Sequence, residues 1–293
     1  MIYTLSNDSL TIKINSFGAE LQSIFDNHSN QELLWQANKQ HWARHAPILF
    51  PIVGKLQNDE LKTAGNSYPI SQHGFARDSE FSLLSQDDTS IELQLKNSEK
   101  TKIHFPFEFE LNIKYKLENT GLRCTFNIRN PSKQVLPFSL GGHPAFNWPL
   151  SPNIPKEKHR IIFNKDETGL MSQLENGLIK DDGVVSPIIH RTLHLKDDLF
   201  NKDALIFKNV HSDTIRYEAV NYDGGVDAFI EMKFSDFNDL GIWMKPGATF
   251  VCLEPWLGYS SSVDFDGDFI EKAGLIHLDP ESSRNFCFEI NVS

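Results

Sequence analysis

The sequence predicts an all-β protein, a large antiparallel β-sandwich with a few short helices. Apolar and polar residues alternate with a period of two along many short runs, and Gly, Asn, Asp or Pro separates these runs. Such alternation gives each strand one buried and one solvated face, as in antiparallel sheets. The chain has 293 residues, and β-sandwiches of that size fold as one domain. We therefore expect a single domain over residues 1–293.

The strongest strand pattern lies in the middle of the chain. Residues 107–118 alternate Phe, Leu, Ile and Tyr with Glu, Asn and Lys, and residues 122–128 resume the alternation after a turn containing Asn119 and Gly121. This pattern predicts an antiparallel hairpin. Residues 9–15 and 90–97 show the same period and predict two further strands.

Helical patterns are scarce. Residues 36–46 predict a short helix before Pro47, with His41 and His45 on one face, and residues 194–204 predict a second. No repeat, low-complexity tract or linker divides the chain.

Charge and cysteine content exclude several classes of protein. The net charge is −11 and the isoelectric point about 5.4, which argues against a nucleic-acid partner. No apolar run approaches the roughly 20 residues of a membrane span, and the N-terminus lacks the pattern of a signal peptide. Three isolated cysteines suggest buried thiols in a reducing compartment. We expect a cytoplasmic monomer or homodimer without a membrane partner.

Three ionisable residues lie beside Gly or Pro and aromatic residues. His73 lies in "ISQHGFARD", His143 in "GGHPAFNWP", and Glu254 in "FVCLEPWLGYS", where it follows an apolar strand. A carboxyl in an apolar setting has a raised pKa and an imidazole titrates near neutrality, so such a pair suits acid–base chemistry. A structural interpretation of each remains open. His143 also suits a core histidine bonded to a carbonyl, and Glu254 a strand-end cap or a partner of Arg.

Common cofactor and nucleophile motifs are absent. The sequence contains no GxGxxG, GxxxxGK[ST], HExxH or GxSxG. Two histidines and a carboxylate can form a metal triad, but His73, His143 and Glu254 are 70 and 111 residues apart and give no local metal signature. We expect neither a metal site nor a cofactor.

The blocks "QHGFAR", "GGHPAFNWPL" and "FVCLEPWLGYSSSVD" together resemble the aldose 1-epimerase (galactose mutarotase-like) family, most closely its bacterial LacX-like branch. The likeness runs from "GAELQSI" near the N-terminus to the C-terminal "FEINV". It implies the large β-sandwich of that family, the galactose mutarotase-like supersandwich. It also implies a cofactor-independent isomerase that interconverts the α and β anomers of an aldose.

The resemblance assigns a role to several residues. It implies that Glu254 is the catalytic base, His143 the catalytic acid and His73 a substrate-positioning residue, and it matches a substrate-binding aspartate to Asp203. Lys55 stands where many relatives have Arg. Lysine is a point donor without the planar fork of Arg, so an altered substrate preference is expected.

The implied chemistry suits these residue types. Glu254 takes the proton of the C1 hydroxyl while His143 protonates the ring oxygen. The ring opens, the aldehyde turns about C1–C2, and the ring closes on the other face. Each acid–base contribution is worth on the order of 10²–10⁴ in rate.

Two further groups of residues have two interpretations each. The aromatic residues Phe75 and Trp256, with Phe146 and Trp148, suit either a floor for the sugar or simple core packing. Arg77 suits a structural pair with Asp78 or Glu80, or a phosphate site shared with Lys55. The alternatives to a mutarotase of free sugars are therefore a hexose-6-phosphate mutarotase and a non-catalytic sugar-binding protein.

Overall fold

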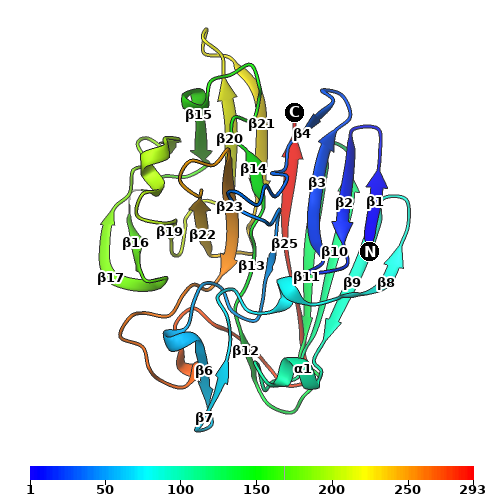
Figure 1. Ribbon diagram of the computed structural model, residues 1–293, viewed down its shortest axis with the longest axis vertical. Helices are drawn as coiled ribbons and strands as arrows, with labels where there is room; N and C mark the ends of the chain where they lie inside the picture. The colour runs from blue at the N-terminus through cyan, green and yellow to red at the C-terminus, as the bar shows by residue number, and fades with distance from the viewer. Residues whose placement is uncertain (168) are drawn as a thin grey trace.

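A computed structural model describes residues 1–167 and 169–293 of the chain (Figure 1). The chain is mostly β, with several antiparallel sheets and short helices, which confirms the predicted fold class. Figure 1 shows the N-terminal strands and the hairpin strands on one side of the molecule, and the strands of residues 170–257 on the other.

The largest sheet has nine strands and is built around the predicted hairpin. Strands β10 (Glu110–Glu118) and β11 (Gly121–Arg129) pair through the turn, although β10 begins three residues later than the alternation suggests. The sheet runs in the order β18 (Thr192–His194), β15 (His159–Phe163), β20 (Thr214–Val220), β21 (Val226–Lys233), β25 (Ser283–Val292), β11, β10, β9 (Ser90–Lys96) and β8 (Ser82–Gln86).

The second sheet has eight strands, and β23 (Phe250–Leu257) lies near its centre. It runs in the order β17 (Leu178–Val185), β16 (Leu170–Glu175), β19 (Leu205–Phe207), β22 (Asp239–Trp243), β23, β13 (Leu140–Gly142) and β5 (Ile48–Leu49), and β14 (Ala145–Asn147) also pairs with β23.

Smaller sheets and short helices complete the fold. The N-terminal sheet contains β1 (Ile2–Ser6), β2 (Leu10–Asn15), β3 (Glu20–Asp26) and β4 (Gln31–Glu32), and two-stranded sheets join β12 (Leu136–Phe138) to β24 (Ile276–Leu278) and β6 (Glu60–Thr63) to β7 (Asn66–Pro69). The helices are α1 (Glu99–Lys102) and the 3₁₀ turns η1 (Gln57–Asp59), η2 (Ala76–Asp78), η3 (Lys156–Lys158), η4 (Asp197–Phe200) and η5 (Phe269–Glu271). None of the helices in these residues is long and apolar enough to cross a membrane.

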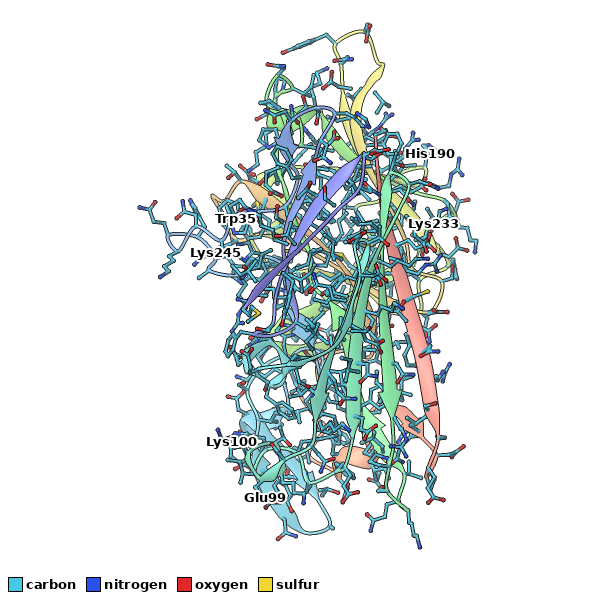
Figure 2. The ribbon with its side chains drawn as sticks, turned by 90° about the vertical axis from the view of Figure 1, so that its right-hand side faces the viewer. Trp35, Glu99, Lys100, His190, Lys233 and Lys245 are labelled. Atoms are coloured by element: carbon cyan, nitrogen blue, oxygen red, sulfur yellow. The ribbon has the colours of Figure 1, made fainter. Side chains whose placement is uncertain are left out.

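A continuous apolar core joins the N-terminal sheet to the nine-stranded sheet. Ile12 of β2, Ile113 of β10 and Phe126 of β11 are fully buried in one cluster. The buried hydroxyl of Tyr115 donates to the carbonyl of Ala19 at 2.8 Å, which ties the two sheets together by a polar contact. Charged side chains such as Lys100, Lys233 and Lys245 lie on the outside of the molecule (Figure 2).

The predicted helix over residues 36–46 is wrong. The segment is a loop with one local turn, in which the N–H groups of His41 and Trp42 donate to the carbonyl of Asn38. Beyond that turn, the N–H groups of His45 and Ala46 both donate to the carboxylate of Glu20. Ala37 also has a positive φ of 50°, which a helix does not accommodate. The helix predicted over residues 194–204 is reduced to the four residues of η4.

Candidate active site

An interruption between β13 and β14 positions His143. Gly141 of β13 pairs with Trp256, and Ala145 of β14 pairs with Cys252, so both strands use the same neighbour, β23. Between them, His143 and Pro144 leave the ladder, and the N–H of Leu253 donates to the carbonyl of Pro144 at 3.1 Å. The backbone therefore stays attached to β23 while the imidazole reaches across that strand.

The two glycines before His143 allow close packing. A Cβ on Gly141 would lie 2.6 Å from Cδ1 of Trp256 and 3.0 Å from the carbonyl oxygen of Pro255. A Cβ on Gly142 would lie 2.8 Å from the ring of Phe288. Neither glycine has a positive φ, so the lack of a side chain is what these positions require.

Glu254 lies within β23 and not after its end, as the sequence suggested. The strand continues through Pro255 to Leu257. Leu253 points its N–H toward the interruption between β13 and β14, and alternation points the missing N–H of Pro255 to the same side. The ladder is already interrupted there, so proline is tolerated within a central strand.

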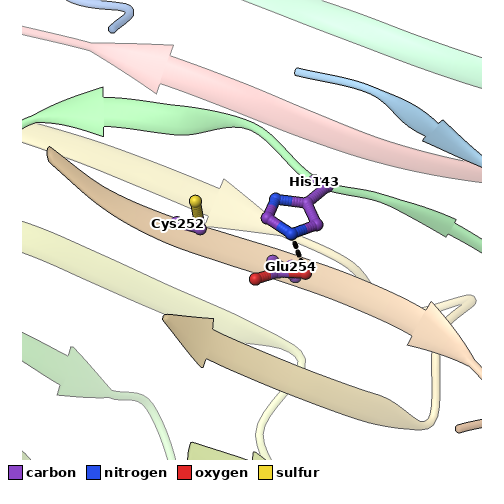
Figure 3. A group of neighbouring side chains, drawn as sticks. All are labelled: His143, Cys252 and Glu254. Carbon is purple, nitrogen blue, oxygen red and sulfur yellow. Dashed lines mark ion pairs between the residues drawn. The ribbon is translucent and has the colours of Figure 1, made fainter. Parts of the chain in front are cut away.

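His143 and Glu254 form a buried pair. Nε2 of His143 lies 3.0 Å from Oε2 of Glu254, and the two residues are 6% and 1% exposed (Figure 3). The two atoms are close without being aligned for a hydrogen bond, and Nδ1 of His143 is buried without a partner within the described chain. Polar atoms that are buried and unpartnered in this way are rare and mark sites of binding or chemistry.

Burial shifts both pKa values toward the neutral forms. It raises the pKa of Glu254 well above its ordinary value, and the nearby carboxylate of Asp203 acts in the same direction while Trp256 opposes it. Burial lowers the pKa of His143 to about 3. Between these limits the pair holds one proton, which either the carboxyl or the imidazole can carry.

His73 lies beside this pair. Its ring meets that of His143 edge to face, with centroids 5.7 Å apart, and the residue is 9% exposed. Nδ1 of His73 accepts a hydrogen bond from the N–H of Gly54 at 3.1 Å, which fixes the neutral tautomer with hydrogen on Nε2. Burial, followed by the charge of His143, lowers the pKa of His73, so this ring acts as a neutral donor.

The pair and His73 line one cavity of about 270 Å³. This volume is close to the lower end of the range for small-ligand sites, about 300–1,000 Å³. The cavity combines indole rings with a few polar groups, and its wall comprises Trp42, Gly54, Gln72, His73, Arg77, His143, Leu174, Asp203, Ala204, Ile206, Trp243, Glu254, Trp256 and Ser260.

Two tryptophans that the sequence analysis did not single out form an aromatic wall around His143. Trp42 stacks on the imidazole with centroids 4.9 Å apart, and Trp243 meets it edge to face at 5.9 Å. Trp42 lies in the loop that was expected to be a helix, and Trp243 ends β22 next to β23. Of the aromatic residues considered from sequence, Trp256 lines the cavity, whereas Phe146 and Trp148 are buried in the core.

Asp203 and Arg77 also line the cavity. Asp203 has a positive φ of 82°, and its carboxylate accepts from the N–H of Ala204 at 2.8 Å. Arg77 lies 3.7 Å from Asp78 through Nε and donates to the carbonyl of Gln72 at 2.5 Å. Burial, followed by the charge of Arg44, lowers the pKa of Arg77 to about 10.

Lys55 and Phe75 do not line this cavity, contrary to the expectation that they belong with the other residues. The backbone N–H of Lys55 donates to Ser260, which lines the cavity. The Nζ of Lys55 lies 3.5 Å from Asp59, and both residues line a different hollow. Phe75 follows a turn with positive φ at His73 and Gly74, which directs its ring toward Phe50 and Phe109. The proposed two-charge site of Lys55 and Arg77 is therefore not formed inside the cavity.

Larger hollows elsewhere on the surface of the described chain lack buried acid–base partners. Two of about 580 and 610 Å³ share Phe75 and His104. Neither is lined by a close pair of buried titratable groups. Buried acid–base partners, and not volume, therefore identify the cavity at His143 and Glu254 as the candidate active site.

Comparison with known proteins identifies the family of the chain. Residues 1–219 match the family model described as aldose 1-epimerase. The chain belongs to the aldose 1-epimerase family. It is 30% identical to protein LacX (plasmid) of Lactococcus lactis subsp. lactis, with 100% of this chain and 99% of LacX covered.

Solved structures of similar proteins have the same fold as this member of the aldose 1-epimerase family. The crystal structure of a galactose mutarotase related enzyme from Lactobacillus acidophilus is 33% identical, with a TM-score of 0.93, and the match covers 100% of this chain and 97% of that one. A galactose mutarotase-like protein from Lactobacillus casei is 28% identical over the whole of both chains, with a TM-score of 0.92.

Proposed function

We propose that the protein is an aldose 1-epimerase, a mutarotase that interconverts the α and β anomers of a hexose. The observation that carries this proposal is the 3.0 Å contact between Nε2 of His143 and Oε2 of Glu254 at the wall of the cavity. Anomerisation moves protons at two oxygens, O1 and O5, that are bonded to the same carbon. An acid and a base for this reaction must therefore be neighbours, as these two groups are.

In the proposed reaction, the carboxylate of Glu254 removes the O1 proton while the imidazolium of His143 protonates O5. The C1–O5 bond breaks, and the products are the open-chain aldehyde, a protonated Glu254 and a neutral His143. After rotation about C1–C2, His143 recovers the O5 proton and Glu254 returns its proton to O1. No atoms or electrons are gained or lost by the protein over one cycle.

The protonation of the buried pair suits this cycle. The state with Glu254 ionised and His143 protonated contains the same single proton as the state with both groups neutral. Burial favours the neutral state in the absence of substrate. Hydroxyl groups of a bound sugar supply hydrogen-bond partners to both groups, and transfer between the two states needs no exchange of protons with the solvent.

Other groups of the cavity suit sugar binding. The Nε2–H of His73 and the carboxylate of Asp203 offer a donor and an acceptor for hydroxyl groups. Trp256 lines the cavity, and its indole N–H is buried without an acceptor within residues 1–167 and 169–293. Trp42 and Trp243 also line the cavity, and their indole rings provide apolar surface for the C–H groups of a sugar ring.

Anomer exchange measured by NMR tests the proposal. Fresh α-glucose and α-galactose are expected to equilibrate faster with the protein than in buffer, and Glu254→Gln, which keeps the shape but removes the base, is expected to lose most of that acceleration. A wild-type protein that accelerates none of a panel of free and phosphorylated aldoses would refute the proposed activity. Sugar binding by calorimetry without any exchange would instead indicate a non-catalytic sugar-binding protein.

Arg77 supports a second candidate substrate, a hexose 6-phosphate. Arg77 lines the cavity, and its Nε is buried without a hydrogen-bond partner in the described structure. Such a group suits an anionic substituent. If the substrate is phosphorylated, Arg77→Gln lowers kcat/KM for the hexose 6-phosphate much more than for the free hexose. Equal losses on both substrates would assign Arg77 a structural role beside Asp78.

A further inference from the structure

A third ionisable group lies against the buried pair. Cys252 precedes Glu254 by two residues on β23, so alternation places both side chains on the same face of the strand. One nitrogen of His143, the sulfur of Cys252 and a carboxylate oxygen of Glu254 all lie within 4.8 Å of one another (Figure 3). All three residues are buried, and the proposed proton transfers do not use the thiol.

Two atoms of this cluster lack a hydrogen-bond partner. Nδ1 of His143 and Oε2 of Glu254 are buried, and none of the described residues makes a hydrogen bond with either. The residues are 6% and 1% exposed, so solvent does not readily replace the missing partners. The cluster thus combines a thiol with an imidazole and a carboxyl group that each have a buried atom without a hydrogen bond.

We propose that His143, Cys252 and Glu254 form a binding site for a soft divalent cation, Zn²⁺ or Cd²⁺. Imidazole, thiolate and carboxylate are the three ligand types that zinc uses in proteins, whereas Mg²⁺ and Ca²⁺ select oxygen ligands. One thiolate and one carboxylate carry two negative charges. They neutralise a dication, so the occupied site has no net charge to bury.

The geometry requires only local side-chain movement. Zinc bonds of about 2.0–2.3 Å place tetrahedral ligand atoms roughly 3.3–3.6 Å apart. Ligand atoms within 4.8 Å therefore need to approach by at most about 1.2–1.5 Å, a distance within the reach of side-chain rotation. His143 and Glu254 line the cavity, so the fourth position of the ion can be open to water.

Two protons must leave when the ion binds, one from the thiol and one from the pair of Glu254 and His143. Burial, followed by the charge of Glu254, raises the pKa of Cys252 well above its ordinary value, so the free site holds a neutral thiol. The cation displaces both protons to the solvent and keeps the sulfur as thiolate and Glu254 as carboxylate. Removal of these protons lowers the affinity of the site for any cation. Soft cations bind best, because their strong bonds to sulfur offset this loss.

An effect on activity follows from the same atoms, and it rests on the proposed function. The ion occupies the carboxylate and the imidazole that the anomerisation needs for proton transfer. Bound Zn²⁺ or Cd²⁺ is therefore expected to inhibit anomer exchange, and chelation is expected to restore it.

Titration of the full chain with Cd²⁺ after chelator treatment tests the site without any sugar. Near-ultraviolet absorption from thiolate-to-cadmium charge transfer is expected to saturate at one ion per chain. Cys252→Ser is expected to abolish this absorption and to weaken binding by about tenfold or more. Cys287→Ser is the matched control, because Cys287 lies half-buried on β25, outside the cluster, and this variant is expected to titrate like wild type.

Absorption that persists in Cys252→Ser, or disappears in Cys287→Ser, would overturn the site. If Cys252→Ser does not fold, X-ray absorption of Zn²⁺ bound to the wild type provides a second test. One sulfur neighbour together with nitrogen or oxygen neighbours supports the site. A coordination shell without sulfur overturns it. A protein that binds the ion but never accelerates anomer exchange refutes the proposed function alone. Full activity with the ion bound refutes only the inhibition.

Discussion

The indole of Trp42 stacks on the imidazole of His143, with ring centroids 4.9 Å apart and planes inclined by 29°. His143 lies in the interruption between β13 and β14, outside the paired residues of either strand. The stack, together with the edge of Trp243, restricts rotation of the imidazole. Trp42 is therefore a positioning residue for the proposed acid.

Replacement of Trp42 tests this role. An aromatic pair is worth about 0.5–1.5 kcal/mol beyond burial, so Trp42→Ala is expected to lower kcat for anomer exchange by about 2- to 12-fold. Trp42→Phe keeps a stacking face and is expected to recover most of the rate. If both variants lose kcat equally while the thermal midpoint is unchanged, the stack does not position the acid.

The pH dependence of anomer exchange follows from the shared proton of the pair. A second proton makes the buried pair positive and loss of the only proton makes it negative, so burial disfavours both changes. The acid limit lies toward the pKa of about 3 of His143, and the alkaline limit lies well above the ordinary Glu value of 4.5. We expect a broad plateau in the pH–rate profile. A loss of rate on the acid side with a midpoint near 6.5, the ordinary histidine value, would contradict the burial argument.

Glu254 is expected to lower stability at neutral pH. Its pKa is raised in the folded state, so above pH 4.5 the unfolded chain releases a proton that the folded chain retains, and the free energy of unfolding falls as pH rises. A tenfold difference in acid dissociation constant between the folded and unfolded chains corresponds to about 1.4 kcal/mol. Glu254→Gln removes this loss and is expected to raise the thermal midpoint at pH 7 by at least about 2 °C, with a smaller gain near pH 4.

The control for this comparison is Glu99→Gln in α1, because the side chain of Glu99 is 92% exposed. Its replacement is expected to change the midpoint equally at both pH values. A Glu254→Gln variant that is less stable than wild type at pH 7 would show that the carboxylate stabilises the fold.

Gly141 allows β13 to approach Trp256. A methyl group there would lie 2.6 Å from the indole, so Gly141→Ala is expected to destabilise the protein by about 1–3 kcal/mol and to displace Trp256 from the cavity wall. Denaturant unfolding measures the first effect and the KM for sugar the second. Gly169→Ala is the control, because no described atom lies within 4 Å of the added carbon. Equal stability of the two variants would contradict the packing argument.

Local sequence patterns were sufficient for the strands. The alternation around Ile113 and Phe126 reflects burial on one face, so it predicted the hairpin of β10 and β11 and the class of fold. The segment around Trp42 could not be predicted in the same way. Its conformation depends on bonds to Glu20, which lies 25 residues away from His45, and no local periodicity records such a contact.

The candidate site, too, was predicted in part by local sequence patterns and in part depends on contacts that they do not record. The family blocks indicated His73, His143 and Glu254, and these residues line one cavity. The side chains of Lys55 and Phe75 follow turns in the chain. The backbone torsion angles of those turns decide the direction in which each side chain points. Cys252 was counted among the isolated cysteines, because His143 lies 109 residues away from it in the chain. Continuation of β23 through Pro255 places Cys252 and Glu254 on the same face.

A double-mutant comparison of anomer exchange by NMR tests most directly whether Glu254 and His143 act as one acid–base unit. Glu254→Gln and His143→Gln are each expected to lower the exchange rate by about 10²-fold or more, and the double variant is expected to be no slower than the slower single variant, because either change alone disables the pair. Single variants that retain the wild-type rate, or losses that multiply in the double variant, would contradict the account.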